Sequence, residues 1–245
     1  MTGSPAGAMD AVLDGKVALI TGGSKGIGLA IAEALVAHGA RVAITGRDPA
    51  ALERAQSRLG PHALTASADA RVADEVERAV QATVDGHGSL DVLVNNAGIG
   101  VFKNAADMSN AEWQSTIDTN LTGVFYYCRA AIPHLRRRGG GWIVNISSLA
   151  GKNPFVGGAA YCASKAGLNA FSEALMQEVR YDNIRVTCVM PGSVATGFSG
   201  RGEHGKADWK IQPEDVGQVV LDLLAMPPRS LPSRVELRPS KPQKS

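Results

Sequence analysis

The stretch Lys16-Val-Ala-Leu-Ile-Thr-Gly-Gly-Ser-Lys-Gly-Ile-Gly-Leu-Ala-Ile-Ala-Glu-Ala-Leu35 joins a short apolar run to a helical apolar pattern through a glycine-rich turn. Apolar residues at these spacings predict a strand followed by a helix. Gly22, Gly26 and Gly28 permit a tight turn, close approach of a ligand and packing of the helix on the strand. Free N–H groups at a helix start attract an anion. The unit therefore predicts a cradle for the pyrophosphate of a dinucleotide, although the motif alone is also compatible with a structural turn.

Strand and helix patterns alternate through the rest of the chain. Repeated strand–helix units form a parallel sheet with right-handed crossovers and helices on both faces. The sequence therefore predicts an α/β fold, a single-domain doubly wound parallel sheet (Rossmann fold), at residues 15–238, with flexible segments at 1–14 and 239–245. After the opening unit, strands are predicted at 41–45, 62–68, 90–95, 142–146, 184–190 and 234–237, and helices at 50–59, 74–84 with an end at Gly86, 109–138 with a break near Asn120, 157–180 and 213–224.

Composition and charge favour a small-molecule partner. Of the 245 residues 44% are hydrophobic, and 25 basic against 23 acidic side chains leave a net charge of +2. This balance gives no electrostatic reason to bind nucleic acid or an anionic membrane. Cys128, Cys162 and Cys188 lack the spacing of a disulfide framework or a zinc site, which predicts a reducing compartment and no metal. No stretch resembles a secretory signal or a membrane span, so we expect a cytoplasmic protein.

A candidate catalytic pair lies in the predicted helix 157–180. Tyr161 and Lys165 are four residues apart and therefore share one helix face. The reference pKa of tyrosine is ~10, and lowering it by about 3 units requires roughly 4 kcal/mol of extra stabilisation of the phenolate. A nearby ammonium acts in that direction, which would make Tyr161 a proton donor or acceptor opposite a carbonyl group. This spacing is frequent on amphipathic helices, so the pair alone does not identify a site.

Several separate motifs together resemble the classical short-chain dehydrogenase/reductase family. They occur in the order and at about the spacings of that family, from roughly Lys16 to Thr196. The resemblance implies an oxidoreductase that interconverts a carbonyl and an alcohol by hydride transfer. The motifs are Thr21-Gly-x-x-x-Gly-Ile-Gly28, Asn95-Asn-Ala-Gly98, Asn120, Asn145-Ile-Ser-Ser148, Tyr161 with Lys165, and Pro191-Gly192.

The resemblance implies a role for each of four side chains. Tyr161 corresponds to the general acid/base, and Lys165 to the residue that tunes it and holds the nicotinamide ribose. Ser148 corresponds to the hydroxyl that positions the substrate carbonyl, whereas its neighbour Ser147 is expected to pack or cap locally. Asn120 corresponds to the asparagine that holds a water in the proton relay.

The end of the second predicted strand indicates which dinucleotide binds. NAD sites commonly place an acidic side chain there, but the aligned residue is Gly46 and Arg47 follows it. The guanidinium of Arg47 and the ammonium of Lys25 would bind a 2′-phosphate. Asp48, with Pro49 behind it, is interpreted as a helix cap. The predicted cofactor is therefore NADP(H).

The remaining cofactor contacts are implied by the same resemblance. Asp69 corresponds to an aspartate that contacts adenine, but it is also compatible with a cap of the following turn. The full predicted cofactor set is Gly22, Ser24, Lys25, Gly26, Ile27, Gly28, Arg47, Asp69, Ala70, Asn96, Ala97, Gly98, Tyr161, Lys165, Pro191, Gly192, Val194 and Thr196.

The sequence does not name the substrate. Loop 193–212, where the family usually recognises substrate, carries no identifying motif, and the chain finishes Arg234-Val-Glu-Leu-Arg-Pro239 where many ketoacyl-carrier-protein reductases have an Asp-Gly-Gly-like segment. We expect a 3-oxoacyl thioester or another small ketone. The alternative is an NADP-binding regulatory or scaffold protein with the same fold and little turnover. A hydrolase based on Ser148 is disfavoured because no Gly-x-Ser-x-Gly elbow surrounds it.

The family resemblance also implies a homo-oligomer. We expect a homotetramer, built largely from the predicted helices between Asn110 and Arg138 and between Gly157 and Arg180. Apolar side chains such as Phe125 and Phe171 are compatible with that role, but they are equally compatible with packing on the sheet.

Overall fold

The computed structural model describes residues 13–199 and 208–242. Most of the predicted N-terminal segment, the last three residues of the predicted tail and the middle of loop 193–212 lie outside the described residues. The proposed domain boundaries stay a prediction.

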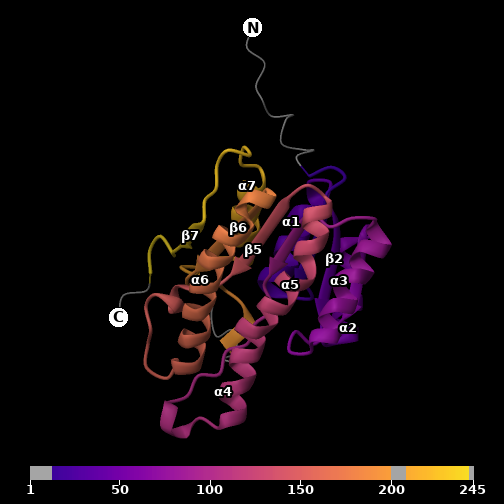
Figure 1. Ribbon diagram of the computed structural model, residues 1–245. Coiled ribbons are helices and arrows are strands. Elements are labelled where there is room, and N and C mark those ends of the chain that lie inside the picture. The colour runs from indigo at the N-terminus through magenta and orange to yellow at the C-terminus, as the bar shows by residue number, and fades with distance from the viewer. Residues whose placement is uncertain (1–12, 200–207, 243–245) are drawn as a thin grey trace.

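Within the described residues, seven strands form one parallel sheet in the order β3-β2-β1-β4-β5-β6-β7 (Figure 1). Helices cover both faces of this sheet, which confirms the predicted doubly wound α/β fold. The strands are β1 (Val17–Thr21), β2 (Arg41–Gly46), β3 (Ala63–Ser67), β4 (Val92–Asn95), β5 (Gly141–Ile146), β6 (Ile184–Pro191) and β7 (Arg234–Leu237). The helices are α1 (Gly26–Ala37), α2 (Pro49–Leu59), α3 (Ala73–His87), α4 (Asn110–Ile117), α5 (Gly123–Arg137), α6 (Ala159–Val179) and α7 (Pro213–Leu224).

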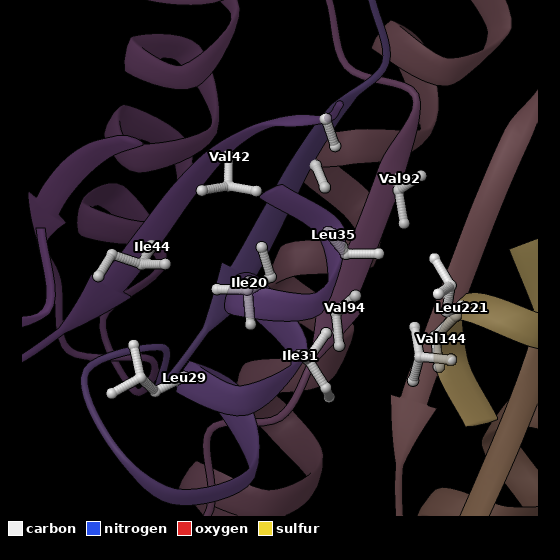
Figure 2. Close-up of a cluster of buried hydrophobic side chains, with 14 of the residues drawn as sticks. Ile20, Leu29, Ile31, Leu35, Val42, Ile44, Val92, Val94, Val144 and Leu221 are labelled. Atoms are coloured by element: carbon white, nitrogen blue, oxygen red, sulfur yellow. The ribbon is translucent and has the colours of Figure 1, made fainter. Parts of the chain in front are cut away.

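Alternate residues of the central strands face opposite sides of the sheet and build two hydrophobic layers. On one side, Ile20 and Val94 join the apolar faces of α1, α2 and α7 (Figure 2). On the other side, Leu19 and Leu93 join the apolar faces of α3, α5 and α6. Strands that are buried on both faces need continuous apolar runs, which explains the β-branched stretches in the sequence.

Helix α3 extends further than the sequence predicts. The prediction ends this helix at Gly86, but α3 continues to His87 and the left-handed residue at its end is Gly88 (φ 83°). Gly86 lies inside the helix, and a larger residue would not fit there because its Cβ would be 2.4 Å from Cδ1 of Leu64. Gly86 therefore permits close packing of α3 on β3, and only Gly88 serves as the C-terminal cap.

The helical region before β5 contains the predicted break. Helix α4 begins at a capping box, in which the Ser109 hydroxyl accepts a hydrogen bond from the N–H of Glu112 and the Glu112 carboxylate accepts one from the N–H of Ser109. Between α4 and α5 the backbone forms one π-helical turn, Asp118–Thr122. Such turns hold one extra residue and are frequent at functional sites.

The strand order reverses direction at β1, which lies between β2 and β4. In open parallel sheets, ligands bind in the crevice beyond the carboxyl ends of the strands at such a point. Thr21, Asn95 and Ile146 end β1, β4 and β5, and the glycine turn, the Asn96–Gly98 segment and Ser148 follow them. The fold therefore brings the predicted motifs to one edge of the sheet. No helix in the described part of the chain is both long and apolar enough to span a membrane.

Candidate active site

The glycine turn after β1 has the backbone that the sequence predicts. Gly22 (φ 64°) and Gly26 (φ 55°) adopt left-handed conformations that disfavour any side chain. A Cβ at Gly23 would lie 2.6 Å from Cγ2 of Ile44, so this residue must also remain small. The first residues of α1 have no side-chain cap, and their N–H groups are therefore available for an anion.

A network of hydrogen bonds joins the glycine turn to the end of β4. The Thr21 hydroxyl accepts hydrogen bonds from the N–H groups of Asn96 (3.0 Å) and Ala97 (2.9 Å). The Asn96 amide donates to the carbonyl oxygens of Thr21 (3.0 Å) and Gly22 (3.1 Å). Gly28 accommodates this amide, because a Cβ there would lie 2.4 Å from its nitrogen. Thus the Asn96 side chain braces the two walls of the crevice.

Asn120 lies in the π-helical turn and is fully buried. Its amide nitrogen donates to the Ile99 carbonyl (2.9 Å) and the Ser164 hydroxyl (3.0 Å), and its side-chain oxygen accepts from the N–H of Ile99 (2.8 Å). Ser164 in turn donates to the carbonyl oxygen of Tyr161 (2.7 Å). The Asn120 side chain therefore links the segment after β4 to the first turns of α6, and its role in a water relay stays a prediction.

Lys165 is buried beneath the site. Its ammonium donates a hydrogen bond to the carbonyl oxygen of Ile146 at the end of β5 (2.9 Å). A Cβ at Gly98 would be 3.8 Å from Nζ of Lys165 and 3.3 Å from Oδ1 of Asn120, so these predicted residues do lie together. Burial lowers the pKa of Lys165 from 10.5 to about 8.

Tyr161 and Ser148 face each other across the start of α6. Burial raises the pKa of Tyr161 above its ordinary value, and the nearby Ser148 hydroxyl lowers it by a smaller amount. The Lys165 ammonium lies 5.9 Å from the centre of the Tyr161 ring. The expected lowering of the tyrosine pKa by Lys165 is therefore absent in the protein alone, because the ammonium bonds to Ile146 and burial dominates.

Ser147, unlike Ser148, points into the core. It donates to Oδ1 of Asn169 (2.6 Å) and lies 3.3 Å from the carbonyl oxygen of Lys165. Its side chain is buried, as expected for a serine with a local packing role.

The residues expected to hold the adenosine end lie around the carboxyl end of β2. Ser24 approaches Gly46, because a Cβ on that glycine would be 3.4 Å from the Ser24 hydroxyl. Arg47 is exposed. The Asp48 carboxylate accepts hydrogen bonds from the N–H groups of Ala50 and Ala51 and caps α2, as interpreted from the sequence. An aspartate used in this way does not compete for the ribose.

Asp69 is engaged within the protein. Its carboxylate accepts hydrogen bonds from the backbone and the guanidinium of Arg71. This hydrogen bonding is the main reason why the pKa of Asp69 lies below its ordinary value. The turn-capping alternative is therefore present, and the predicted adenine contact is untested. Its neighbour Ala70 is buried against the start of α5, where a Cβ at Gly123 would be 2.7 Å from the Ala70 carbonyl oxygen.

The segment after β6 closes the other side of the crevice. Val194 pairs with Ile211 in an isolated parallel bridge, which fixes the segment where it leaves the sheet. The methyl carbon of Thr196 would be 3.5 Å from a Cβ at Gly26, so this segment reaches the glycine turn. Pro191 is the last residue of β6, and the N–H of Gly192 donates to the Leu237 carbonyl (2.8 Å).

One group of residues at the site is absent from the sequence predictions. Phe102 and Phe198 place their ring centres 5.5 Å and 5.7 Å from that of Tyr161, and Phe155 lies 5.9 Å from Phe102. The three phenylalanines come from separate loops with no shared spacing, so no periodic signal could reveal the cluster. Among the described residues, no group of three or more His, Cys, Asp or Glu side chains is arranged as a metal site.

The fold and this site define a class of protein: a doubly wound α/β protein with a Tyr–Lys pair near the carboxyl ends of its central strands, the edge at which such folds bind ligands. The family model for short chain dehydrogenases matches residues 16–206. The chain therefore belongs to the short-chain dehydrogenase family of oxidoreductases.

Individual relatives agree with this assignment. The chain is 38% identical to the 3-oxoacyl-acyl-carrier-protein reductase FabG of Chlamydia pneumoniae, over 88% of this chain and 92% of that protein. A metagenomic short-chain oxidoreductase solved in complex with NADP is 37% identical, with a TM-score of 0.83 over 95% of this chain and 100% of its own. The alcohol dehydrogenase of the archaeon Thermococcus sibiricus, complexed with 5-hydroxy-NADP, is 30% identical, with a TM-score of 0.86 over 94% and 99% of the two chains.

Proposed function

We propose that this protein is an NADP-dependent oxidoreductase that interconverts a ketone and a secondary alcohol. The observation that carries the proposal is the buried Lys165, whose ammonium lies beside Gly98 and bonds to the end of β5, one helical turn from Tyr161 with its neighbouring Ser148 hydroxyl. A proton donor, a hydroxyl that orients a carbonyl and a cation are thus held next to a crevice for a dinucleotide.

The residues of the crevice fit a dinucleotide phosphate. The uncapped start of α1 offers N–H groups and a favourable helix dipole to a pyrophosphate, and the left-handed Gly22 and Gly26 carry no side chain of their own that would obstruct it. Lys25 and Arg47 are exposed cations at the positions proposed to receive the 2′-phosphate. Two relatives of known structure hold NADP or a hydroxylated NADP, which supports the same choice.

The mechanism follows from the chemistry of these groups. An NADPH molecule held in the crevice would supply the hydride that reduces the carbonyl carbon, with NADP⁺ as its oxidised product. Ser148 donates a hydrogen bond to the carbonyl oxygen and orients it, and Tyr161 transfers its phenolic proton to that oxygen as the alcohol forms. Lys165 stabilises the resulting phenolate, which recovers a proton from solvent through the proposed water relay at Asn120. Burial raises the pKa of Tyr161, so its phenol carries the proton that this step requires.

The substrate is a small ketone or a 3-oxoacyl thioester. The relative from Chlamydia supports the thioester by its name. The final strand β7 carries Arg234-Val-Glu-Leu237, however, where the sequence departs from the pattern of many reductases of that kind. We propose a homotetramer that acts on small molecules in the cytoplasm, with neither nucleic acid nor membrane as a partner.

The experiment that tests this function is a panel of ketones with NADPH, followed by nicotinamide absorbance, on the wild type and Tyr161→Phe. We expect Tyr161→Phe to lower kcat by about 10²- to 10⁴-fold, because it removes the proton donor and keeps the ring. The NADPH dissociation constant, measured by fluorescence, should change less than about threefold.

Tyr181→Phe is the matched control. Tyr181 is 90% exposed beyond the end of α6, and its variant should keep wild-type turnover. Turnover of Tyr161→Phe within a few-fold of wild type would remove Tyr161 from the mechanism. NADPH binding without turnover of any ketone would instead support the regulatory or scaffold alternative.

A further inference from the structure

Two phenylalanine rings from different loops contact the Tyr161 ring, and a third phenylalanine from another loop contacts one of them. Phe102 follows β4, Phe155 precedes α6 and Phe198 follows β6. The Phe102 ring meets Tyr161 edge to face, with an angle of 68° between the ring planes, and Phe198 is tilted against the same ring by 55°. We call Phe102, Phe155 and Phe198 the aromatic wall.

The aromatic wall is not part of the hydrophobic core. Phe102 is 36% exposed, Phe155 49% and Phe198 41%. A ring that stays exposed forgoes the favourable free energy of burying its apolar surface. Clusters of such rings commonly mark a binding surface. The exposed area lies directly against the ring that is proposed to donate the proton, so it faces whatever substituent a bound ketone carries.

Small residues hold the rings in place. A Cβ at Gly100 would lie 2.7 Å from Cζ of Phe102 and 2.8 Å from Cε1 of Phe198. A Cβ at Gly158 would lie 2.6 Å from Cε2 of Phe155. The rings therefore rest directly on glycine backbone, and any larger residue at either position would force them to move.

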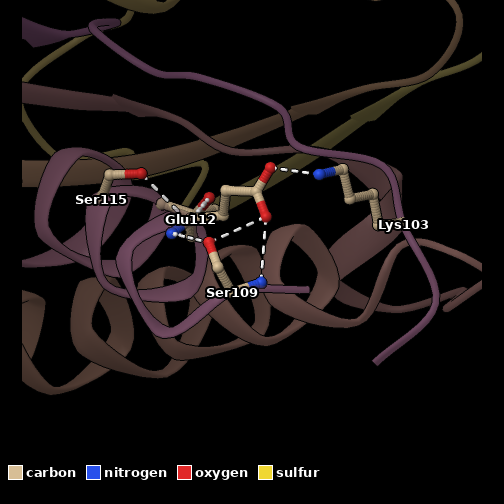
Figure 3. Close-up of polar contacts among 5 residues, drawn as sticks. Lys103, Ser109, Glu112 and Ser115 are labelled. Carbon is tan, nitrogen blue, oxygen red and sulfur yellow. Dashed lines mark hydrogen bonds and ion pairs between the residues drawn. The ribbon is translucent and has the colours of Figure 1, made fainter. Parts of the chain in front are cut away.

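An ion pair anchors the loop that carries Phe102. The ammonium of Lys103 binds the Glu112 carboxylate, which also belongs to the capping box of α4 (Figure 3). This pairing fixes the residue next to Phe102 and occupies the cation with an internal partner. Lys152, close to Phe155 in the sequence, is likewise paired with Glu236. Among the described residues close to these rings in the sequence, Lys103 and Lys152 are thus paired with protein carboxylates rather than left for a substrate anion.

We propose that the aromatic wall binds the flat, apolar substituent of an uncharged ketone and so selects aryl or similar apolar ketones as substrates. This inference rests on the proposed function, because it places the carbonyl of that ketone at Tyr161 and Ser148. Rings that meet edge to face or in offset stacks favour an aromatic partner beyond the area that they bury.

The test compares acetophenone, 4-acetylbenzoate and butanone as substrates with NADPH. Wild-type kcat/KM should be highest for acetophenone, because butanone lacks the ring and 4-acetylbenzoate carries a charge into the wall. Phe102→Ala and Phe198→Ala should each raise the KM for acetophenone by about tenfold, leave butanone within about twofold and leave NADPH affinity unchanged. Phe102→Leu removes the aromatic ring but keeps most of the apolar volume. Its loss of acetophenone binding would therefore come from the missing ring and not from misfolding.

Tyr181→Ala is the control, because it removes an exposed ring at the opposite end of α6. Unchanged acetophenone kinetics in both phenylalanine variants, or a preference for 4-acetylbenzoate, would overturn the proposal. If no ketone is reduced, the proposed function fails, and saturation-transfer NMR of acetophenone with the NADP⁺-bound protein still decides this inference. A saturation-transfer signal of the acetophenone ring that is present with the wild type and lost with Phe102→Ala supports the proposal. Signals of equal size with both proteins, or no signal with the wild type, contradict it.

Discussion

At the scale of single residues, burial acts on Tyr161 and Lys165 in opposite directions. It raises the pKa of the tyrosine and lowers that of the lysine to about 8. In both cases the neutral form is favoured because a charge loses hydration in the interior. At neutral pH, without cofactor, Tyr161 is therefore a protonated phenol and Lys165 is still an ammonium. Lys165 loses its proton when the pH rises about one unit above neutral.

The lowered pKa of Lys165 makes a testable contribution to stability. Between the folded pKa of about 8 and the ordinary value of 10.5, the unfolded chain binds the proton more strongly than the folded chain. The free energy of unfolding should therefore rise with pH across this window, and the cost of burying the charge is fully present below about pH 8. Relative to Lys165→Met, the wild type should gain about 2 kcal/mol between pH 7 and 9.5, as measured by urea unfolding without cofactor.

The comparison with Lys165→Met removes the contribution of every other group that titrates in this range. Lys25→Met is the control, because Lys25 is exposed and its removal should leave the pH slope of the wild type unchanged. If the free energy of unfolding depends on pH in the same way for the wild type and Lys165→Met, burial does not lower the pKa of Lys165.

The sequence revealed part of the site at this scale. Tyr161 and Lys165 could be paired because helical spacing places them on one face. The hydrogen bond from Lys165 to Ile146 and the ring contacts of Phe102 and Phe198 depend on how distant loops meet. These contacts follow no repeat along the chain, so they emerge only in three dimensions.

At the scale of elements, the start of α2 determines which charges remain beside β2. Asp48 gives its carboxylate to the N–H groups of Ala50 and Ala51, and Pro49 occupies the first helical position. The acidic group is thus committed to the helix, while Arg47 remains exposed next to it.

This arrangement predicts a preference for NADPH over NADH of more than roughly tenfold. Each charge-assisted hydrogen bond from Arg47 or Lys25 to the 2′-phosphate would contribute about 1.5 to 3 kcal/mol, less the screening at exposed positions. The double variant Arg47→Ala with Lys25→Ala should lose NADPH affinity while NADH affinity changes little, as measured by fluorescence titration. Arg54→Ala is the control, because Arg54 is an exposed cation further along α2. Equal wild-type affinities for the two cofactors would contradict the proposal.

The ends of a helix could be predicted from the sequence where neighbouring residues in the chain determine them. The capping box of α4 and the start of α7 at Pro213 follow from side chains that bond within one turn. The end of α3 did not follow, because Gly86 serves a contact with Leu64 that lies more than twenty residues earlier. The sequence alone does not distinguish a glycine that tertiary packing requires from a glycine that ends a helix.

At the scale of the whole molecule, the outer surface of α4 and α5 leaves large aromatic side chains exposed. Phe171 packs with Val124 and Leu168 against the hydrophobic layer on one face of the sheet, which is one of the two arrangements expected for it. Phe125, by contrast, is 43% exposed on α5, and Trp113 is 43% exposed on α4. Arg129 lies 5.6 Å from the Phe125 ring centre, which adds a cation to this outer surface.

We predict that the protein forms a homotetramer through the outer surfaces of α4, α5 and α6, and that the exposed rings on α4 and α5 belong to this interface. Light scattering at micromolar concentration should give about four times the chain mass of 25.5 kDa. Phe125→Glu should lower that mass, because it places a charge where an interface core would exclude it. Val72→Glu, at another exposed apolar residue, should leave the mass unchanged. A mass of one chain for the wild type would contradict the assembly.

The π-helical turn at Asp118–Thr122 has a consequence for how the gene tolerates change. Its single extra residue allows Asn120 to reach both Ile99 and Ser164 while α4 and α5 keep their own orientations. Removing one codon here would restore a regular helix but rotate one flank against the other by about 100°. Substitutions on the outer side of the turn therefore preserve the frame that a deletion destroys. Along this segment, the fold therefore depends more on the number of residues than on the identity of those on the outer side.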